Sequence, residues 1–104
     1  MTGVKLWGMG VSLEERVRLS VAALLQVTGE SQADLARVLG VAQAQVSRRQ
    51  SGTVAWSLAD CEAVAAHYGI DVLDLFAGPT RACDRVPAGR RRVTVRAASR
   101  AVAR

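Results

Sequence analysis

Features that direct a chain toward a membrane, secretion or metal binding are scarce in these 104 residues. No apolar run approaches the 18 residues that a membrane-spanning helix needs, and the N-terminus has neither the basic region nor the apolar core of a secretory signal. Two cysteines, Cys61 and Cys83, have no metal-ligand or redox spacing and are expected as reduced thiols. The single histidine, His67, has no second ligand at metal-binding spacing, so we expect an exposed helix residue and no metal or cofactor.

The residue combinations that support catalysis are also missing. The sequence shows no nucleophile–base pair, no paired carboxylates in an apolar setting and no glycine-rich phosphate loop, so it does not predict an enzyme. Only four residues are aromatic, which predicts a small core of leucine, valine and alanine that dimerisation would help to stabilise. The overall composition is typical of a soluble globular protein, which we expect to be cytoplasmic.

Positive charge is concentrated at one end of the chain. Residues 1–79 carry six basic and eight acidic side chains, a net charge of −2, whereas residues 80–104 carry eight arginines and one aspartate, a net charge of +7. A basic tail on a slightly acidic body favours contact with the phosphates of a nucleic acid. The alternative interpretation is a tail that only keeps the protein in solution.

Residues 31–52 are typical of two short helices joined by a tight turn. Ser31 is a good N-cap for a first helix, and Gly40 suits the left-handed backbone at its end. The small side chain of Ala36 lets a second helix, residues 43–51, cross closely, with Val46 pointing into the crossing. The opposite face of the second helix is then free to meet a partner and carries Gln43, Ala44, Ser47 and Arg48.

This segment resembles the helix-turn-helix of Cro/repressor-type (Xre-like) regulators. The residues that carry the resemblance are Gln32, Leu35-Ala36, Gly40-Val41, Val46-Ser47-Arg48 and Gly52. The stretch SLADCEAVAAHYGIDVLDLFAG is similar to the fourth and fifth helices of that family, so the resemblance covers roughly residues 12 to 78. It implies an all-α, five-helix Cro/repressor-like domain that binds double-stranded DNA.

The resemblance assigns the second helix of the pair to the major groove. There Gln43 can bond both edge atoms of adenine, Ala44 can touch a thymine methyl, and Arg48 suits guanine or phosphate. In the family the residue at Gln32 commonly contacts phosphate, where the helix N-terminus also points its free amides. The remaining candidates for DNA contact in this region are Ala42, Gln45, Ser47, Arg49 and Thr53.

Several positions depart from the family pattern. Ala42 replaces the usual Ser or Thr cap, and Arg49 replaces an apolar residue, so its guanidinium is expected to reach outward to water. Gln50 and Leu25 replace the two partners of a typical ion pair with neutral residues. The loop from Thr53 to Trp56 lacks the usual basic side chain, and Trp56 is expected in the core or a dimer contact.

The other elements divide the chain into three parts. Residues 1–11 are expected as an arm whose Trp7 could pack on the body. The DNA-binding domain, residues 12–78, adds a first helix from Ser12 to Gly29 and two later helices capped by Ser57 and Asp71. Residues 79–104 are expected as an Arg-rich extension with a possible short β-hairpin over residues 84–96. Within that extension Arg90, Arg91 and Arg92 are candidates for phosphate contact.

We therefore expect a sequence-specific DNA-binding transcriptional regulator of the phage or bacterial repressor kind, acting as a homodimer. The fifth helix has more apolar side chains than a small monomer needs to bury, so its Leu73, Leu75 and Phe76 are the expected dimer contact. A DNA-binding regulator of this kind is also expected to be nucleoid-associated. Two alternatives stay open: an antitoxin whose tail binds a toxin, and a helix-turn-helix that binds protein instead of DNA. The slightly acidic body and the bare loop favour the last alternative.

Overall fold

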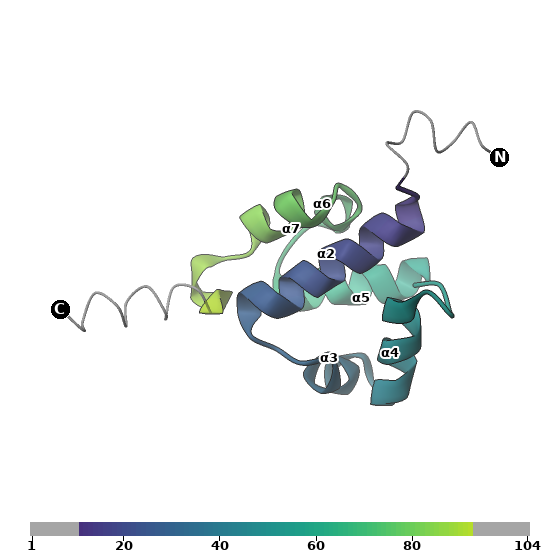
Figure 1. The fold of residues 1–104 in the computed structure, drawn as a ribbon. Helices are drawn as coiled ribbons and strands as arrows, with labels where there is room; N and C mark the ends of the chain where they lie inside the picture. Colours follow the sequence, from purple (N-terminus) through teal and green to yellow (C-terminus); the bar gives the residue numbers. More distant parts are fainter. Residues whose placement is uncertain (1–10, 93–104) are drawn as a thin grey trace.

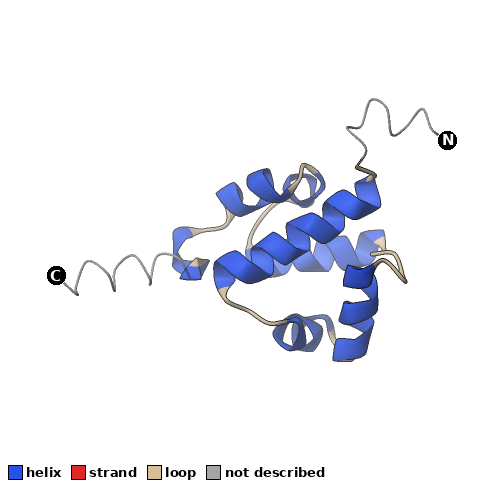
Figure 2. Ribbon diagram, viewed as in Figure 1, coloured by secondary structure: helices blue, strands red, loops and turns tan. Residues whose placement is uncertain are grey.

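The computed structural model describes residues 11–92, and these are all-helical with no β-strand (Figures 1 and 2). One long helix, α2, lies across the middle of the molecule, with α6 and α7 on one side and α3 and α4 on the other (Figure 1). None of the described helices is long and apolar enough to cross a membrane. The elements are α2 (Leu13–Thr28), α3 (Gln32–Leu39), α4 (Gln43–Ser51), α5 (Leu58–Tyr68), α6 (Val72–Phe76), α7 (Pro79–Arg85) and the 3-10 turn η1 (Ala88–Arg90).

The helix boundaries follow from capping residues. Ser31 and Ser57 each accept a hydrogen bond from a backbone amide of the first turn, and an aspartate three residues on accepts one in return from the cap amide. Asp71 forms the same arrangement at α6. Gly40 ends α3 with φ at 75°, a left-handed conformation that costs a residue with a Cβ and allows α4 to follow within two residues.

The core forms where α2 packs against α4, α6 and α7. Its inward face buries Val17, Val21 and Leu24, and the hydroxyl of the fully buried Ser20 donates to the carbonyl of Leu75 at 2.8 Å. This bond satisfies a polar group that would otherwise be costly to bury and ties α2 to α6. The other buried apolar side chains of the core are Leu35, Ala36, Val46, Trp56, Cys61, Val64, Tyr68, Leu75, Ala82 and Val86.

The fold differs from the sequence prediction after Gly78. A sixth α-helix, α7, follows the five that the sequence predicts, and it packs against α2 with Ala82 fully buried. Val86, just beyond it, is also buried, so the segment after Gly78 begins as part of the common core. This helix is difficult to predict from the sequence, because it is short and has few apolar residues. Its main sequence signal is Pro79 at its first position.

The predicted hairpin is wrong for the part of it that the structure describes. Residues 84–85 belong to the end of α7, and residues 88–90 form the turn η1. The guanidinium of Arg91 donates to the backbone carbonyls of Cys83 and Val86, which holds this segment folded back on itself. Residues 1–10 of the predicted arm, which include Trp7, lie outside the described residues, and so does the tail beyond Arg92.

Candidate nucleic-acid interface

The pair α3 and α4 is held in one arrangement by its small and apolar residues. Ala36 is 3% exposed and Val46 is fully buried at the place where the two helices cross. The amide of Val41 donates to the carbonyl of Ala36 at 3.0 Å, which closes the turn around Gly40. These three predicted packing positions, Ala36, Gly40 and Val46, are confirmed. The pair therefore presents the other face of α4 in a fixed orientation.

That outer face of α4 is polar and open to solvent. The side chains of Gln43, Ala44, Ser47 and Arg48 are all exposed, and Gln45 is half-buried beside them. Ala42 makes no side-chain cap. The amide of Gln45 donates to the carbonyl of Ala42 at 2.9 Å, and the amides of Gln43 and Ala44 remain available to an anion. Gln32, in the first turn of α3, is half-buried. Helix amides and amide or guanidinium side chains on one exposed face can match the donors and acceptors of DNA.

Arg49 does not reach outward to water, so this expectation is wrong. Its side chain is only 18% exposed, and its Nε donates to a carboxylate oxygen of Asp60 at 3.0 Å. A second nitrogen donates to the carbonyl of Gln45 at 3.0 Å, and the guanidinium lies 5.8 Å from the ring centre of Trp56. Asp60 also serves as the capping partner of Ser57. Arg49 thus fastens α4 to the first turn of α5.

The carboxylate of Asp60 is stabilised in its charged form. Its burial opposes ionisation, but hydrogen bonds from the Ser57 amide, the Arg49 guanidinium and the Ser57 hydroxyl outweigh this effect and lower the pKa of Asp60. The pKa of Asp34 in the corresponding cap of α3 is also lowered, first by the amide and hydroxyl of Ser31. Both caps are therefore strongest when their aspartates are ionised.

Gln50 joins three parts of the fold through hydrogen bonds of its side-chain amide. Its amide nitrogen donates to the carbonyl of Arg18 at 3.1 Å, and its amide oxygen accepts from the indole nitrogen of Trp56 at 2.9 Å. Trp56 is 9% exposed and packs in the core, as predicted. A neutral amide therefore joins α2, α4 and the following loop. Leu25 is partly buried and packs against the edge of the core.

The loop after α4 presents little positive charge. Thr53 is exposed, its amide donates to the carbonyl of Arg48 at 2.9 Å, and its hydroxyl lies 2.9 Å from that of Ser51. The guanidinium of Arg18 lies close to Gly52, at the carboxyl end of α4, where the helix dipole is negative. On α3, Arg37 pairs with Asp34 at 3.2 Å. Arg48 is the exposed cation on the outer face of α4.

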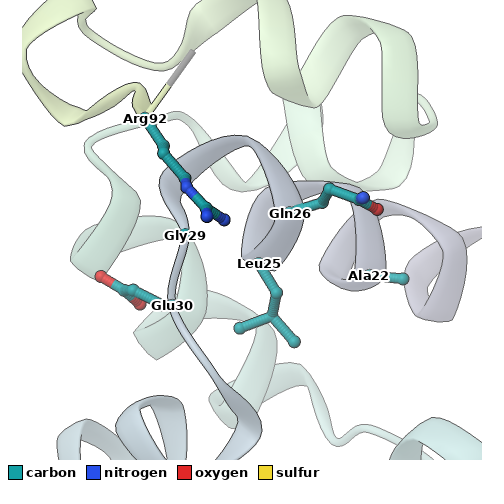
Figure 3. A pocket seen from close by; sticks show the side chains of 6 residues that line it. All are labelled: Ala22, Leu25, Gln26, Gly29, Glu30 and Arg92. Carbon is teal, nitrogen blue, oxygen red and sulfur yellow. The ribbon is translucent and has the colours of Figure 1, made fainter. Parts of the chain in front are cut away.

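The three arginines predicted to hold phosphate differ in what they contact. Arg90 turns inward to Glu30 and the carbonyl of His67, and Arg91 bonds its own segment. Arg92 is exposed and lies along Gly29. Both residues line a shallow hollow, together with Gln26 (Figure 3). In Figure 1 this segment lies at the carboxyl end of α2, with α3 between it and α4. Arg92 is therefore separate from the face of α4.

Glu30 is the centre of a cluster that the sequence does not predict. Its carboxylate lies 3.0 and 3.1 Å from the Nε2 of His67, accepts from the hydroxyl of Tyr68 at 3.1 Å, and lies 3.4 Å from a guanidinium nitrogen of Arg90. The Arg90 guanidinium also stacks 5.6 Å from the ring centre of Tyr68. His67 is thus half-buried and paired, so the prediction of an exposed histidine is wrong.

This cluster joins the residue before the cap of α3 to the last turn of α5 and to η1. Burial, followed by the charge and hydrogen bond of Glu30, raises the pKa of Tyr68 well above its usual range. The described residues contain no group of three His, Cys, Asp or Glu side chains placed to hold a metal ion. Since Glu30 and its partners lie 37 to 60 positions apart, only the tertiary fold brings them together.

The fold defines a small all-helical domain in which the outer face of α4 is polar and exposed. The BetR domain family matches the chain over residues 12–102, so the chain belongs to the BetR domain family. No curated protein and no solved structure matches it. The family match extends from α2 through α7 and η1, which agrees with the packing of α7 on α2 as one unit.

Proposed function

We propose that the protein is a sequence-specific double-stranded DNA-binding regulator of transcription, with the helix-turn-helix of the Cro/repressor type formed by α3 and α4. The observation that carries the proposal is the outer face of α4. Four exposed residues, Gln43, Ala44, Ser47 and Arg48, lie opposite the fully buried Val46. An α-helix with this division can enter the major groove while its inner face stays in the core.

In this proposal the bases are read by α4 and the phosphates are held around it. Gln43 reads adenine, and Arg48 reads guanine or holds a phosphate. The uncapped first turn of α4 and the start of α3 at Gln32 direct backbone amides at the phosphates. Arg92 and the basic residues beyond it contact the flanking duplex. Arg49, Arg90 and Arg91 act within the protein, because their guanidinium groups already bond Asp60, Glu30 and backbone carbonyls.

We also propose that the protein forms a homodimer through α6. Leu73 is 69% exposed and Phe76 is only partly buried, whereas Leu75 between them is in the core. An exposed leucine on a helix of five residues gains stability when a second copy covers it. Sedimentation of the wild type and of Leu73→Asp at tens of micromolar tests this contact. A monomeric wild type, both free and on DNA, would contradict it.

The test of DNA reading begins with selection of preferred sites from random duplexes. Gln43→Ala should then cost about 1–3 kcal/mol on the selected site and almost nothing on random duplex. Gln26→Ala is the matched control, because Gln26 is also an exposed glutamine on a helix but lies on α2, away from α4. Equal losses of Gln43→Ala on both duplexes would show that this side chain reads no base.

A second candidate function is a helix-turn-helix module that binds protein instead of DNA. The observation that favours it is the shortage of available cations, since Arg49, Arg90 and Arg91 are all engaged internally. Binding to random duplex at low salt separates the two functions. Measurable affinity that falls as the salt concentration rises supports DNA binding. An absence of binding at low salt supports the protein-binding module.

A further inference from the structure

An apolar groove of about 190 Å³ lies on the surface beside the start of α2 and the start of α5. Its floor consists of Val17, Trp56 and Cys61, which are at most 9% exposed. Its rim consists of Leu13 and Leu58, and Phe76 of α6 lines it as well. None of the residues proposed to contact DNA lines this groove, and of the residues in the proposed dimer contact only Phe76 borders it, so neither contact occupies its floor.

The rim of the groove leaves apolar surface in water. Leu58 is 72% exposed and Leu13 is 54% exposed, although both stand next to a buried floor. Covering such side chains is favourable by about 25 cal/mol for each Å² of apolar surface removed from water. A concave apolar site with an exposed apolar rim is the usual form of a surface that binds another chain segment.

We propose that this groove binds the N-terminal segment of the same chain, residues 4–9, with the indole of Trp7 as its anchor. The described chain begins at Val11, two residues before Leu13, so the segment is attached at the edge of the groove. Val11 follows Trp7 by four positions, and four residue steps of extended chain span roughly 13–14 Å. The segment also contains Val4, Leu6 and Met9.

The charges on the two sides are complementary. Lys5 is the one charged residue among residues 1–10, and Glu14 is exposed and lines the groove. A lysine two residues from the anchoring tryptophan can lie near that carboxylate while the indole enters the apolar floor. The pairing of an apolar anchor with one complementary charge sets the direction in which the segment enters.

The size of the groove favours a tethered segment over a second copy of the protein. A stable dimer buries on the order of 800 Å² on each partner, far more than a groove of this volume and its two rim leucines provide. A tethered segment needs less contact, because a short linker gives it an effective concentration in the millimolar range. One indole, which can bury about 150–250 Å², matches a site of this size.

The test labels the full chain with 5-fluorotryptophan, which gives one fluorine signal for Trp7 and one for Trp56. Trp7→Phe assigns the signals. A soluble paramagnetic agent should broaden the Trp7 signal about one third as much as in a free peptide of residues 1–10, because a bound indole buries most of its surface. Leu58→Gln should restore the broadening of the free peptide, whereas Leu19→Gln, an exposed leucine elsewhere on α2, should not.

A second measurement uses the two thiols of the same chain. Cys61 is 2% exposed on the groove floor, while Cys83 lies on α7 and provides an internal reference. Trp7→Ala should accelerate alkylation of Cys61 severalfold and leave the rate at Cys83 unchanged. The proposal is overturned if wild-type Trp7 broadens like the free peptide, or if its protection appears only as the protein concentration rises. The latter result would assign the groove to a second copy.

Discussion

Removal of the Glu30 carboxylate should destabilise the fold more than removal of any fully solvated acid. Tyr68 is fully buried, and its hydroxyl donates to Glu30 at 3.1 Å. A buried donor that loses its acceptor costs about 1–3 kcal/mol, and hydrogen bonds to a charged group contribute about 1.5–3 kcal/mol. The bonds share one carboxylate and are not additive, so we expect Glu30→Ala to cost about 2–4 kcal/mol.

Glu30→Gln should cost less, about 1–2 kcal/mol, because the amide oxygen still accepts from Tyr68 while the charge facing His67 and Arg90 is lost. Urea denaturation followed by circular dichroism at 222 nm measures these values. Glu62→Ala, which removes an exposed glutamate from α5, is the matched control and should stay within about 0.5 kcal/mol. Equal costs for Glu30→Ala and Glu62→Ala would refute the reasoning.

The same variant has a spectroscopic consequence, because Tyr68 is the only tyrosine of the chain. Burial is the main reason that the pKa of Tyr68 is raised, and the charge of Glu30 is the next. Glu30→Gln should therefore lower the pKa of Tyr68 partway toward its usual value, as followed by absorbance at 295 nm. A raised pKa gives stability that is full below about pH 10 and is lost as the pH rises through the folded value. An unchanged titration would exclude the contact.

Three further predictions concern other contacts. Asp60→Asn should cost about 1 kcal/mol at pH 7 and progressively less as the pH falls, since a lowered pKa gives stability that is present above about pH 4 and lost on acidification; urea denaturation at a series of pH values from 7 downward measures this, and a constant difference would contradict it. Gln50→Leu should cost about 1–3 kcal/mol and shift the fluorescence of Trp56, because the indole N–H loses its acceptor; unchanged emission would contradict it. Truncation after Arg92 should preserve the helical circular dichroism, whereas truncation after Gly78 should abolish it by removing two buried core residues; a folded Gly78 product would show that α7 is dispensable.

The parts of the fold that the sequence predicts are those set by local rules. Ser31 and Ser57 cap helices because their hydroxyls reach amides within one turn, and Gly40 ends α3 because its backbone is left-handed. The apolar spacing around Ala36 and Val46 likewise fixes which side of each helix is buried. These signals require only residues that are near in sequence, so they predict the helix pair and the exposed face of α4.

The contacts that the sequence does not predict are those between distant segments. Arg49 resembles a surface arginine in the sequence, and its burial depends on an aspartate 11 positions away on another helix. The cluster around Glu30 depends on residues from α5 and η1 that share no sequence pattern. Helix α7 has seven residues with one fully buried side chain, too little apolar spacing to stand out from a basic tail.

These long-range contacts have a common effect on the proposed recognition surface, because both involve α5. The first turn of α5 holds α4 through the ion pair of Asp60 and Arg49. The last turn of α5, through His67 and Tyr68, holds Glu30, which directly precedes the cap of α3. The helix pair is therefore tied at two separated points to one rigid helix of 11 residues. A surface fixed in this way loses little conformational freedom on binding, so more of its contact energy is available to distinguish partners. In the proposed function, residues that touch no partner would thus contribute to recognition through the position that they give to α4.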